Sequence, residues 1–486
     1  MMGRQPETQQ KLFYTCLNLE KRIRKDHSLR KVDSLIDFDF IYKEVENLYG
    51  SNGNVSVPPP VLLKLMLLLV FYNVRSEREL MQTIPERLDW LWFLGYDLDD
   101  EIPDHSVLSK ARTRWGIKVF KTFFERIVWQ CVEAGLIDGS KIFTDASLIQ
   151  ADASNNSVVN QDSLKRYLNK SYRELEKRLE DEHDSEFKKG KANRKYISTT
   201  DPDASVVRMG PGRSRLRYKT HRVVDEQSEI ITATDVTPGE INEAQLLTDL
   251  IEQHETNTGK TVKAAVADSK YGTIDNYLSC CDRDILPHFK SFDKGHKGFG
   301  TRKGIFSPNE FQYDPEKDCF ICPAGETLKL RKLIAHRKHY EYWISSKICN
   351  QCDLKHKCTR SNYGRTVKRH IRQNDLDDML AISESRQAKK DIAKRQHLME
   401  RSYARSKRYG YKRARWRQLW RVQVQEYLTS TIQNMMVLVK NFKEHDRAAL
   451  ALPHPRPKRP FYGIIFSQIL LLLRGHGLLL RTLNYY

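Results

Sequence analysis

The chain has 486 residues and a formal net charge of +20, because 82 Lys and Arg outnumber 62 Asp and Glu. A hydrophobic share of 40% is enough for folded cores, so wholesale disorder is excluded, and the length predicts two to four domains. The large positive charge favours a polyanionic partner, above all nucleic acid. The alternative interpretation is that the charge only keeps the protein soluble. A small-molecule enzyme is disfavoured, because the sequence has no glycine-rich phosphate loop or Ser/His/Asp signature.

Residues 1–139 are predicted to form a helical domain that binds DNA. The apolar residues 61–74 follow three prolines, which suit a helix entrance, and they are too few to span a bilayer, so a buried core helix is expected. The sequence PDHS at 103–106 predicts a turn and a serine cap for a helix that begins near Val107. Short helices with Arg112, Arg114 and Lys118 near one end fit DNA binding, and an oligomerisation domain is the alternative.

Residues 140–290 predict the first part of a ribonuclease H-like α/β core. An apolar strand leads to Asp145, two further strand candidates at 217–226 and 230–239 are joined by a turn, and a helix is expected over 242–259. A buried strand with a polar tip then follows at 262–272. Strand, hairpin, helix and strand is the opening order of a ribonuclease H-like fold. The charged residues 155–215 predict a solvated helical insertion or a disordered arm.

The remainder of the chain predicts an insertion followed by two long helices. Residues 291–385 are turn-rich and bear cysteines, and we expect a β-rich insertion there. Residues 386–443 predict a basic helix that ends near Gly410 and a second helix with apolar residues at helical spacing. The tail 444–486 combines a proline-rich linker with an apolar stretch that is broken by charge. We expect no membrane span in it and assign it no function.

Three acidic residues are candidate ligands of two divalent cations. Asp145 is expected at the end of the first strand, Asp268 at the end of a late strand, and Glu400 in the basic helix. Two-metal phosphodiester chemistry needs carboxylates that converge from separate elements, and this triple meets that need. Each aspartate taken singly is equally compatible with capping the next turn.

The helix that carries Glu400 is also a candidate DNA contact. Lys407 lies seven residues after Glu400, two helical turns away on the same face, and Tyr403 is close to that face. Residues 401–421 hold nine Arg and Lys, among them Arg405, Arg413 and Arg415, and no acidic residue. This pattern favours phosphate contact over a salt-bridged helix surface.

Several ordered blocks make the chain resemble the DDE transposases of bacterial insertion sequences. The blocks are FTDASLIQADAS, ADSKYGT and MERSYARSKRYGYKRARWR, together with PDHSVLSKARTRWG near the N-terminus. The chain is most similar to the group whose last carboxylate lies in a tyrosine-arginine-glutamate-lysine helix. The resemblance implies an Asp145, Asp268 and Glu400 triad that binds two Mg²⁺ or Mn²⁺, nicks transposon ends and joins their 3′-hydroxyls to target DNA.

The same resemblance assigns further residues and partners. It places Tyr271 beside Asp268 and Lys407 after Glu400, as DNA-binding residues. The family's arginine four residues before the glutamate is replaced by Gln396, and its tyrosine by Ala393. Either the adjacent Arg395 takes over the phosphate-holding role, or this part of the motif is absent. The implied partner is double-stranded DNA, bound by a homodimer, in a bacterial protein that is cytoplasmic and associated with the nucleoid, without a membrane. A nuclease that cuts without joining, and a DNA-binding derivative that has lost catalysis, are the alternatives.

Five cysteines between residues 319 and 358 predict a structural zinc site, with reduced cysteines in a loop-rich insertion as the alternative. Their spacing is Cys319-x2-Cys322 and Cys349-x2-Cys352, followed by Cys358. The resemblance favours Cys322, Cys349, Cys352 and Cys358, whereas a ribbon-type site would use Cys319 and omit Cys358. The aromatic residues between the two pairs, Tyr340, Tyr342 and Trp343, are expected to pack in a hairpin core or to stack on an unpaired base.

Overall fold

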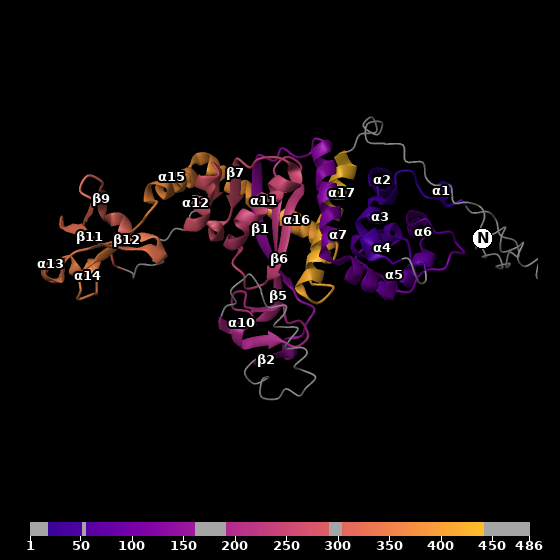
Figure 1. The fold of residues 1–486 in the computed structure, drawn as a ribbon, viewed down its shortest axis with the longest axis horizontal. Helices are drawn as coiled ribbons and strands as arrows, with labels where there is room; N and C mark the ends of the chain where they lie inside the picture. Colours follow the sequence, from indigo (N-terminus) through magenta and orange to yellow (C-terminus); the bar gives the residue numbers. More distant parts are fainter. Residues whose placement is uncertain (1–17, 51–54, 161–190, 291–303, 442–486) are drawn as a thin grey trace, which may run out of the picture. The chain divides into compact units, whose positions relative to one another are not determined.

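The computed structural model describes residues 18–50, 55–160, 191–290 and 304–441, all of them within one compact unit that ends at Asn441. The predicted tail 444–486 lies outside the described residues. The fold is a mixed α/β arrangement with a helical N-terminal region (Figure 1).

Short helices form the N-terminal region. The predicted buried helix is confirmed as α4 (Pro59–Phe71), which begins with prolines in its first turn and is buried along almost its whole length. Among the described helices, none has the length and apolar character needed to cross a bilayer. The other helices of the region are α1 (Leu19–Arg22), α2 (Ser28–Leu35), α3 (Phe40–Val45), α5 (Glu77–Thr83), α6 (Leu88–Leu94) and α7 (Ser106–Glu133).

Helix α7 begins as the sequence indicates, but a different residue stabilises its start. Asp104 Oδ1 accepts a hydrogen bond from the Ser106 backbone N–H at 2.8 Å, and Ser106 is already helical. The expected serine cap is therefore wrong, because the aspartate two residues earlier satisfies the free N–H group. Gly116, with φ of 62° and ψ of −168°, kinks the helix, a conformation that glycine adopts without steric cost.

A mixed sheet forms the centre of the fold. Its strand order is β4-β5-β1-β7-β8, and β6 also pairs with β5. Strand β1 is antiparallel to β5 and parallel to β7, which is itself parallel to β8. The bounds are β1 (Lys141–Gln150), β4 (Ser205–Val207), β5 (Arg215–Asp225), β6 (Ile231–Pro238), β7 (Ala264–Ala267) and β8 (Leu286–Phe289).

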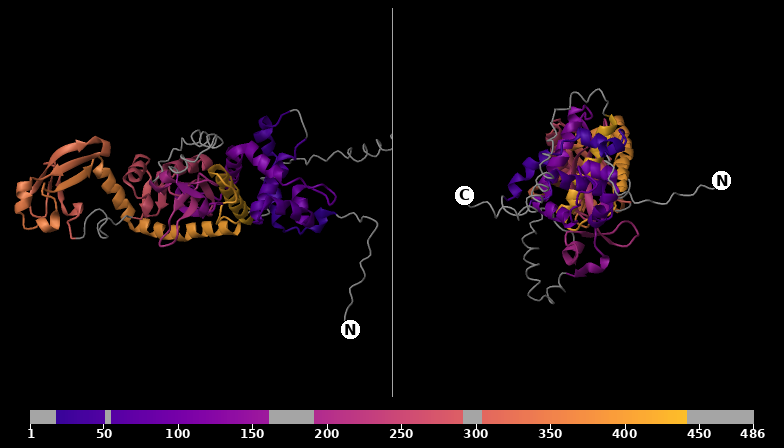
Figure 2. Two further views of the ribbon diagram at one scale, coloured as in Figure 1. Left: turned by 90° about the horizontal axis from the view of Figure 1, so that it is seen from below. Right: turned by 90° about the vertical axis from the view of Figure 1, so that its right-hand side faces the viewer.

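Helices cover both faces of this sheet. Neighbouring residues of β1, whose side chains point to opposite faces, accordingly pack in two different hydrophobic clusters. Ile142 packs in one cluster with α11 and α12, whereas Phe143 packs in another with α7, α16 and α17. Helix α16 contacts β1, β7 and β8, and Figure 2 shows it in orange along the strands. The bounds are α11 (Leu247–Thr258), α12 (Ile274–Asp282), α15 (Gln373–Glu384), α16 (Arg386–Arg408) and α17 (Leu419–Asn441).

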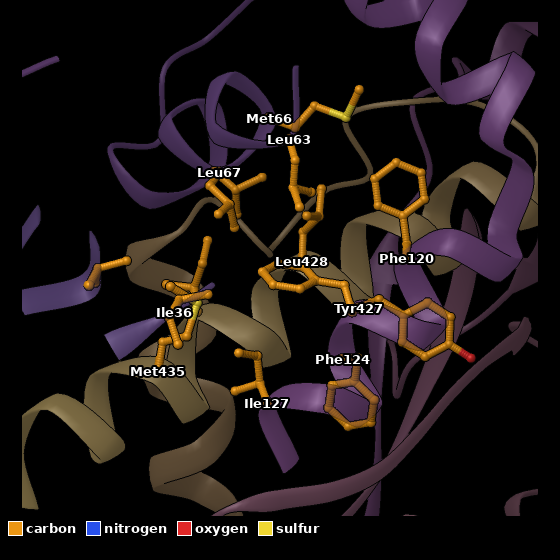
Figure 3. Close-up of a cluster of buried hydrophobic side chains, with 14 of the residues drawn as sticks. Ile36, Leu63, Met66, Leu67, Phe120, Phe124, Ile127, Tyr427, Leu428 and Met435 are labelled. Atoms are coloured by element: carbon orange, nitrogen blue, oxygen red, sulfur yellow. The ribbon is translucent and has the colours of Figure 1, made fainter. Parts of the chain in front are cut away.

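The contact between α17 and α7 joins the C-terminal helix to the N-terminal region. Figure 3 shows the aromatic and aliphatic side chains of both helices in one cluster with α4. Within it, the rings of Phe124 and Tyr427 lie 5.7 Å apart between centroids. These side chains are almost fully buried, so the contact forms one apolar core across segments far apart in the sequence.

Two smaller β structures complete the fold. A two-stranded sheet pairs β2 (Val158–Asn160) with β3 (Tyr196–Ser198), next to the short helix α10 (Lys191–Lys195), whereas the rest of the charged insertion, 161–190, lies outside the described residues. The cysteine-bearing insertion is an antiparallel sheet of order β13-β12-β11-β10-β9 with two short helices. Its elements are β9 (Gln312–Asp314), β10 (Cys319–Ile321), β11 (Thr327–Ile334), β12 (His339–Trp343), α13 (Ser346–Gln351), α14 (Lys355–Cys358) and β13 (Thr366–His370).

Candidate active site

Two of the three predicted carboxylates come to the same level of the central sheet. The parallel pairing of β1 and β7 ends with Phe143 opposite Val266, and Asp145 and Asp268 each follow this pair by two residues. Asp145 is not at the end of its strand, as expected from the sequence, because β1 continues beside β5 to Gln150. Strand β7 stops at Ala267, so Asp145 borders the edge that β7 leaves open. Ligands of open α/β sheets bind at such carboxyl ends of strands.

The environment of Asp145 disfavours its ionised form. Burial raises the pKa of its carboxyl, and the nearby charge of Asp268 raises it further, against the lowering effects of Arg395 and the Ala146 N–H. Arg395 Nη1 forms an ion pair with Asp145 Oδ2 at 2.8 Å. Two carboxylates that repel each other at a partly desolvated site are stabilised by a cation, and here Arg395 supplies the positive charge.

Helix α16 positions its side chains against Asp145 at two points. Besides the Arg395 ion pair, the Tyr403 hydroxyl donates a hydrogen bond to the Asp145 carbonyl oxygen at 2.9 Å. Glu400 lies between these two residues in the sequence, but its side chain is exposed and accepts a hydrogen bond from Gln396 Nε2 at 3.2 Å. Among the described residues, no three His, Cys, Asp or Glu side chains are arranged to hold one metal ion. The structure thus brings Asp145 and Asp268 together and leaves the Glu400 carboxylate apart from them.

The predicted basic contacts of this region differ in their surroundings. Lys407 is exposed on α16. Arg405 forms an ion pair with Glu229 at 2.8 Å, and Arg413 forms one with Asp152 at the same distance. Arg415 donates to the Val74 carbonyl oxygen, and burial lowers the pKa of its guanidinium. Arg415 therefore bonds to the N-terminal helical region, which makes it a structural residue and corrects its expected role at DNA.

Tyr271 also lies away from any DNA-facing surface. It has no exposed surface and belongs to the apolar cluster beneath α11 and α12. Burial raises the pKa of its hydroxyl well above the ordinary value. The tyrosine that follows Asp268 in the sequence is thus a core residue, because the short 3₁₀ turn Ser269–Tyr271 directs it inward.

The N-terminal arginine that suggested DNA contact is likewise internal. Arg112 is 3% exposed and forms an ion pair with Glu77 at 2.5 Å. Its guanidinium lies 4.1 Å from the ring centroid of Trp416, whose Nε1 donates to the same glutamate at 3.2 Å. The expected DNA contact of Arg112 is therefore corrected to a structural contact between α7 and the segment before α17.

A fully buried ion pair behind Asp145 was not anticipated from the sequence. Arg222 lies directly opposite Asp145 in the β1–β5 register and is bound by Glu426 of α17 through Nε–Oε1 and Nη2–Oε2 contacts of 2.6 and 2.9 Å. Arg222 also donates to Ser406 Oγ at 2.6 Å, and its guanidinium lies 5.0 Å from the Tyr403 ring centroid. The available signal was a charged residue directly before apolar residues in each segment, RVV at 222–224 and EYL at 426–428.

Two further acidic residues near the sheet were also not identified from the sequence. Asp391 of α16 is buried, where it contacts His288 Nδ1 at 2.9 Å and Lys141 Nζ at 3.3 Å, so it fastens the helix to β8 and β1. Glu243 accepts from Lys270 Nζ at 2.7 Å, and this hydrogen bond raises the pKa of the Lys270 ammonium, with added contributions from Asp268 and Asp145. Lys270 therefore adds positive potential beside the two aspartates.

Four of the five clustered cysteines line one cavity in the insertion. They are Cys322, Cys349, Cys352 and Cys358, together with apolar side chains such as Ile344 and Leu354. Burial raises the pKa of the Cys358 thiol, the Arg365 charge lowers it, and the charges of the other three cysteines raise it further. Cys319 is buried on β10 and does not line this cavity. The aromatic residue Tyr342 is 1% exposed and packs in the hairpin core.

Comparisons with known proteins match two parts of the chain to transposase domains. A model described as "Transposase domain (DUF772)" matches residues 17–114, and one described as "Transposase DDE domain" matches residues 321–439. The second range includes Glu400 and Lys407, whereas Asp145 and Asp268 lie outside both. No curated protein matches the chain.

Two solved structures of transposases are similar to the chain at low identity. One is the piggyBac transposase synaptic complex with hairpin DNA, at 7% identity and a TM-score of 0.36, which covers 87% of this chain and 78% of that one. The other is the Mos1 transposase paired-end complex with the left transposon end, at 10% identity and a TM-score of 0.16, which covers 51% of this chain and 64% of that one. The two family models together indicate a DDE-type transposase of the insertion-sequence kind.

Proposed function

We propose that the central sheet with its helices is a ribonuclease H-like catalytic core. Support comes from its strand order, β6-β5-β1-β7-β8, in which β5 is antiparallel to both β1 and β6, whereas β7 and β8 run parallel to β1. The order of elements along the chain is the one that this fold predicts. The insertion between β8 and α15 then separates the first two acidic residues from the third.

The function proposed for this core is cleavage and joining of DNA at transposon ends. Asp145, Asp268 and Glu400 are assigned as ligands of two Mg²⁺ or Mn²⁺ ions. The observation that carries this assignment is the alignment of Asp145 and Asp268 at neighbouring parallel strands, with α16 anchored on Asp145 by Arg395 and Tyr403. Bound divalent ions would lower the pKa of the attacking water or 3′-hydroxyl and stabilise the leaving oxygen.

The protein's own residues fit this role in distinct ways. Burial and the charge of Asp268 raise the pKa of Asp145, so the two aspartates form a donor set that a cation would stabilise, and Arg395 pairs with Asp145 in the cation's absence. If a cation paired with Asp145, the Arg395 guanidinium would be free to bind a DNA phosphate. Glu400 would have to change its side-chain conformation to reach the same cation, because its present partner is Gln396 on the exposed side of α16.

DNA binding is proposed for the exposed basic residues of α16 and the segment after it. Lys407 is exposed, and Arg405 and Arg413 each form an ion pair with one carboxylate at the surface. Such surface ion pairs are weak, so the phosphates of DNA can replace the carboxylates as partners of the arginines. The substrate is double-stranded DNA with terminal inverted repeats. A homodimer on DNA is proposed because both ends of the element must be brought together. A location at the bacterial nucleoid is proposed because the DNA substrate lies there.

A structural zinc ion is proposed for the insertion, with Cys322, Cys349, Cys352 and Cys358 as ligands. These thiols line a single cavity, and the charges of Cys349, Cys322 and Cys352 add to the burial that raises the pKa of Cys358, so a divalent cation would stabilise the thiolates. A zinc ion there would tie β10, α13 and α14 together.

The test is cleavage of the element's own terminal inverted repeats by the purified protein with Mg²⁺ or Mn²⁺. Asp145→Ala, Asp268→Ala and Glu400→Ala are each expected to abolish cutting and to retain DNA binding. Glu384→Ala, which removes an exposed acid just before α16, is the matched control and should cut normally.

The products separate the outcomes. Joined strand-transfer products support a transposase, whereas cutting without joining would indicate a ribonuclease H-like nuclease. Binding without metal-dependent cutting by the wild-type protein would indicate a derivative that has lost catalysis. Normal cutting by Asp268→Ala would remove that residue from the site.

A further inference from the structure

The insertion sheet has one covered and one open face. The covered face carries Phe320, Leu328, Tyr342 and Val367, which pack with Ile344 and Cys349 from the helical side. Residues one step along each strand point to the opposite face, because side chains alternate across a sheet. The open face is thus made by the neighbours of these core residues on β11, β12 and β13, whereas the β10 neighbour Cys319 is itself buried.

Basic side chains dominate the middle of this open face. The pairing places Lys332, Glu341 and Lys368 in one row across β11, β12 and β13, and Lys329, Trp343 and Thr366 in the next. All three lysines are exposed. Within the described ranges, none of them has an ion-pair partner, whereas Glu341 is engaged by Arg331 at 3.4 Å.

The geometry of these rows suits an extended polyanion. Rows two residues apart are separated by about 6.6 Å along the strands, and neighbouring strands by about 4.8 Å, so the backbone attachment points of the three lysines form a triangle on the sheet. Their positions are set by sheet pairing instead of by mobile loops. An array of unpaired cations on a regular surface attracts phosphates through release of their counterions.

We propose that this open face, defined by Lys329, Lys332 and Lys368, binds the phosphate backbone of duplex DNA without regard to sequence. The inference deepens the proposed function, since it assumes that the protein acts on DNA, and it gives the insertion a role beyond holding zinc. Lysine ammonium groups act as point charges toward phosphates and do not identify bases, so the contact adds affinity and not specificity.

Duplex DNA fits this face better than a single strand. Proteins that bind single strands stack successive bases on several aromatic side chains. The open rows contain one such ring, Trp343, and the Arg331 guanidinium already lies 5.6 Å from its centroid, while its Nε1 donates to the Tyr363 carbonyl oxygen at 2.9 Å. With one partly occupied ring, the surface lacks a stacking platform.

The experiment compares two triple variants of the full chain that remove the same charge. The test variant is Lys329→Ala, Lys332→Ala and Lys368→Ala. The matched control is Lys317→Ala, Lys347→Ala and Lys357→Ala, which removes three exposed lysines of the same insertion from the β9–β10 turn and from α13 and α14. Binding to a labelled duplex of random sequence is measured over a series of KCl concentrations.

The test variant is expected to bind more weakly at low salt and to lose about one unit of the slope of log K against log salt for each lysine removed. The control is expected to keep the wild-type slope within a fraction of a unit. Equal slopes for both variants would overturn the inference, and so would a loss confined to single-stranded DNA. Circular dichroism and cysteine-bound zinc content establish that both variants fold.

Failure here is distinguishable from failure of the proposed function. If the wild-type protein binds and cuts its transposon ends while the two triple variants behave alike, the sheet-face inference alone is wrong. If the wild-type protein does not bind DNA, the proposed function itself is wrong.

Discussion

The buried Arg222–Glu426 ion pair allows a quantitative test of how the core is held behind Asp145. Both side chains are 0% exposed, and Glu426 Oε1 also accepts from Thr234 Oγ1 at 2.7 Å and from Ser430 Oγ at 2.8 Å. Glu426→Gln keeps the shape of the side chain, but it removes the negative charge and turns one acceptor into a donor that faces the guanidinium. The variant therefore leaves a buried charge without its counter-ion.

The expected cost follows from this geometry. Breaking a fully buried ion pair by altering one partner costs about 3–5 kcal/mol, because the remaining charge is desolvated and uncompensated. Urea unfolding, followed by circular dichroism, should therefore show a large loss in the free energy of unfolding for Glu426→Gln. As a control, Lys394→Gln breaks a half-exposed pair with Glu226 and should cost less than about 1 kcal/mol.

A double variant separates the charge effect from general damage to the core. Arg222→Met combined with Glu426→Leu removes both charges, and apolar replacements of a whole buried pair are often neutral or stabilising. We expect the double variant to be more stable than Glu426→Gln alone. A cost under about 1 kcal/mol for Glu426→Gln, or a double variant less stable than the single one, would refute the reasoning.

Three other predictions follow from the site and the insertion. Asp145→Asn should raise the melting temperature at neutral pH, because the raised pKa of Asp145 shows that its ionised form destabilises the fold. This gain in melting temperature should shrink as the pH falls below the folded pKa and vanish below the ordinary aspartate pKa. No gain at neutral pH would show that burial does not disfavour the charge. Cys352→Ser should lose zinc measured by mass spectrometry and Cys319→Ser should retain it, whereas equal zinc in both variants would contradict the assigned ligands. Arg112→Met should destabilise the protein by about 3 kcal/mol in urea unfolding, because it leaves Glu77 without its ion-pair partner. The slope of log K against log salt concentration for DNA binding should stay unchanged, and a smaller slope would indicate that Arg112 contacts DNA after all.

Local patterns in the sequence were sufficient for the elements that carry the site. The alternation of apolar residues predicted β5 and β6, and helical spacing with capping residues predicted α4, α16 and α17. Spacing indicated a cysteine cluster but left open which four of its five members belong together, and only the resemblance favoured the set that lines the cavity. These features depend on neighbours within a few residues, so a single segment contains the information for each of them.

The length of β1 and the short strand β8 could not be obtained in this way. Asp145 was expected at a strand end because the residues after it become polar, yet β1 continues to Gln150 beside the long strand β5. Strand β8 has four residues with proline in second place, a weak strand signal, and it exists because β7 pairs with it. In both cases hydrogen bonds to a distant strand outweigh the local preference.

The sequence by itself determined the opening order of strand, hairpin, helix and strand, the three candidate carboxylates and the excess of positive charge. Only the tertiary structure decided which charged residues are internal: Arg112, Arg222 and Arg415 bond to partners more than 30 residues away, whereas the insertion lysines stay open. The physical reason is that burying a charge costs desolvation free energy, which is offset only where the fold supplies a counter-charge or a hydrogen-bond acceptor. Such partners come from elements that are remote along the chain.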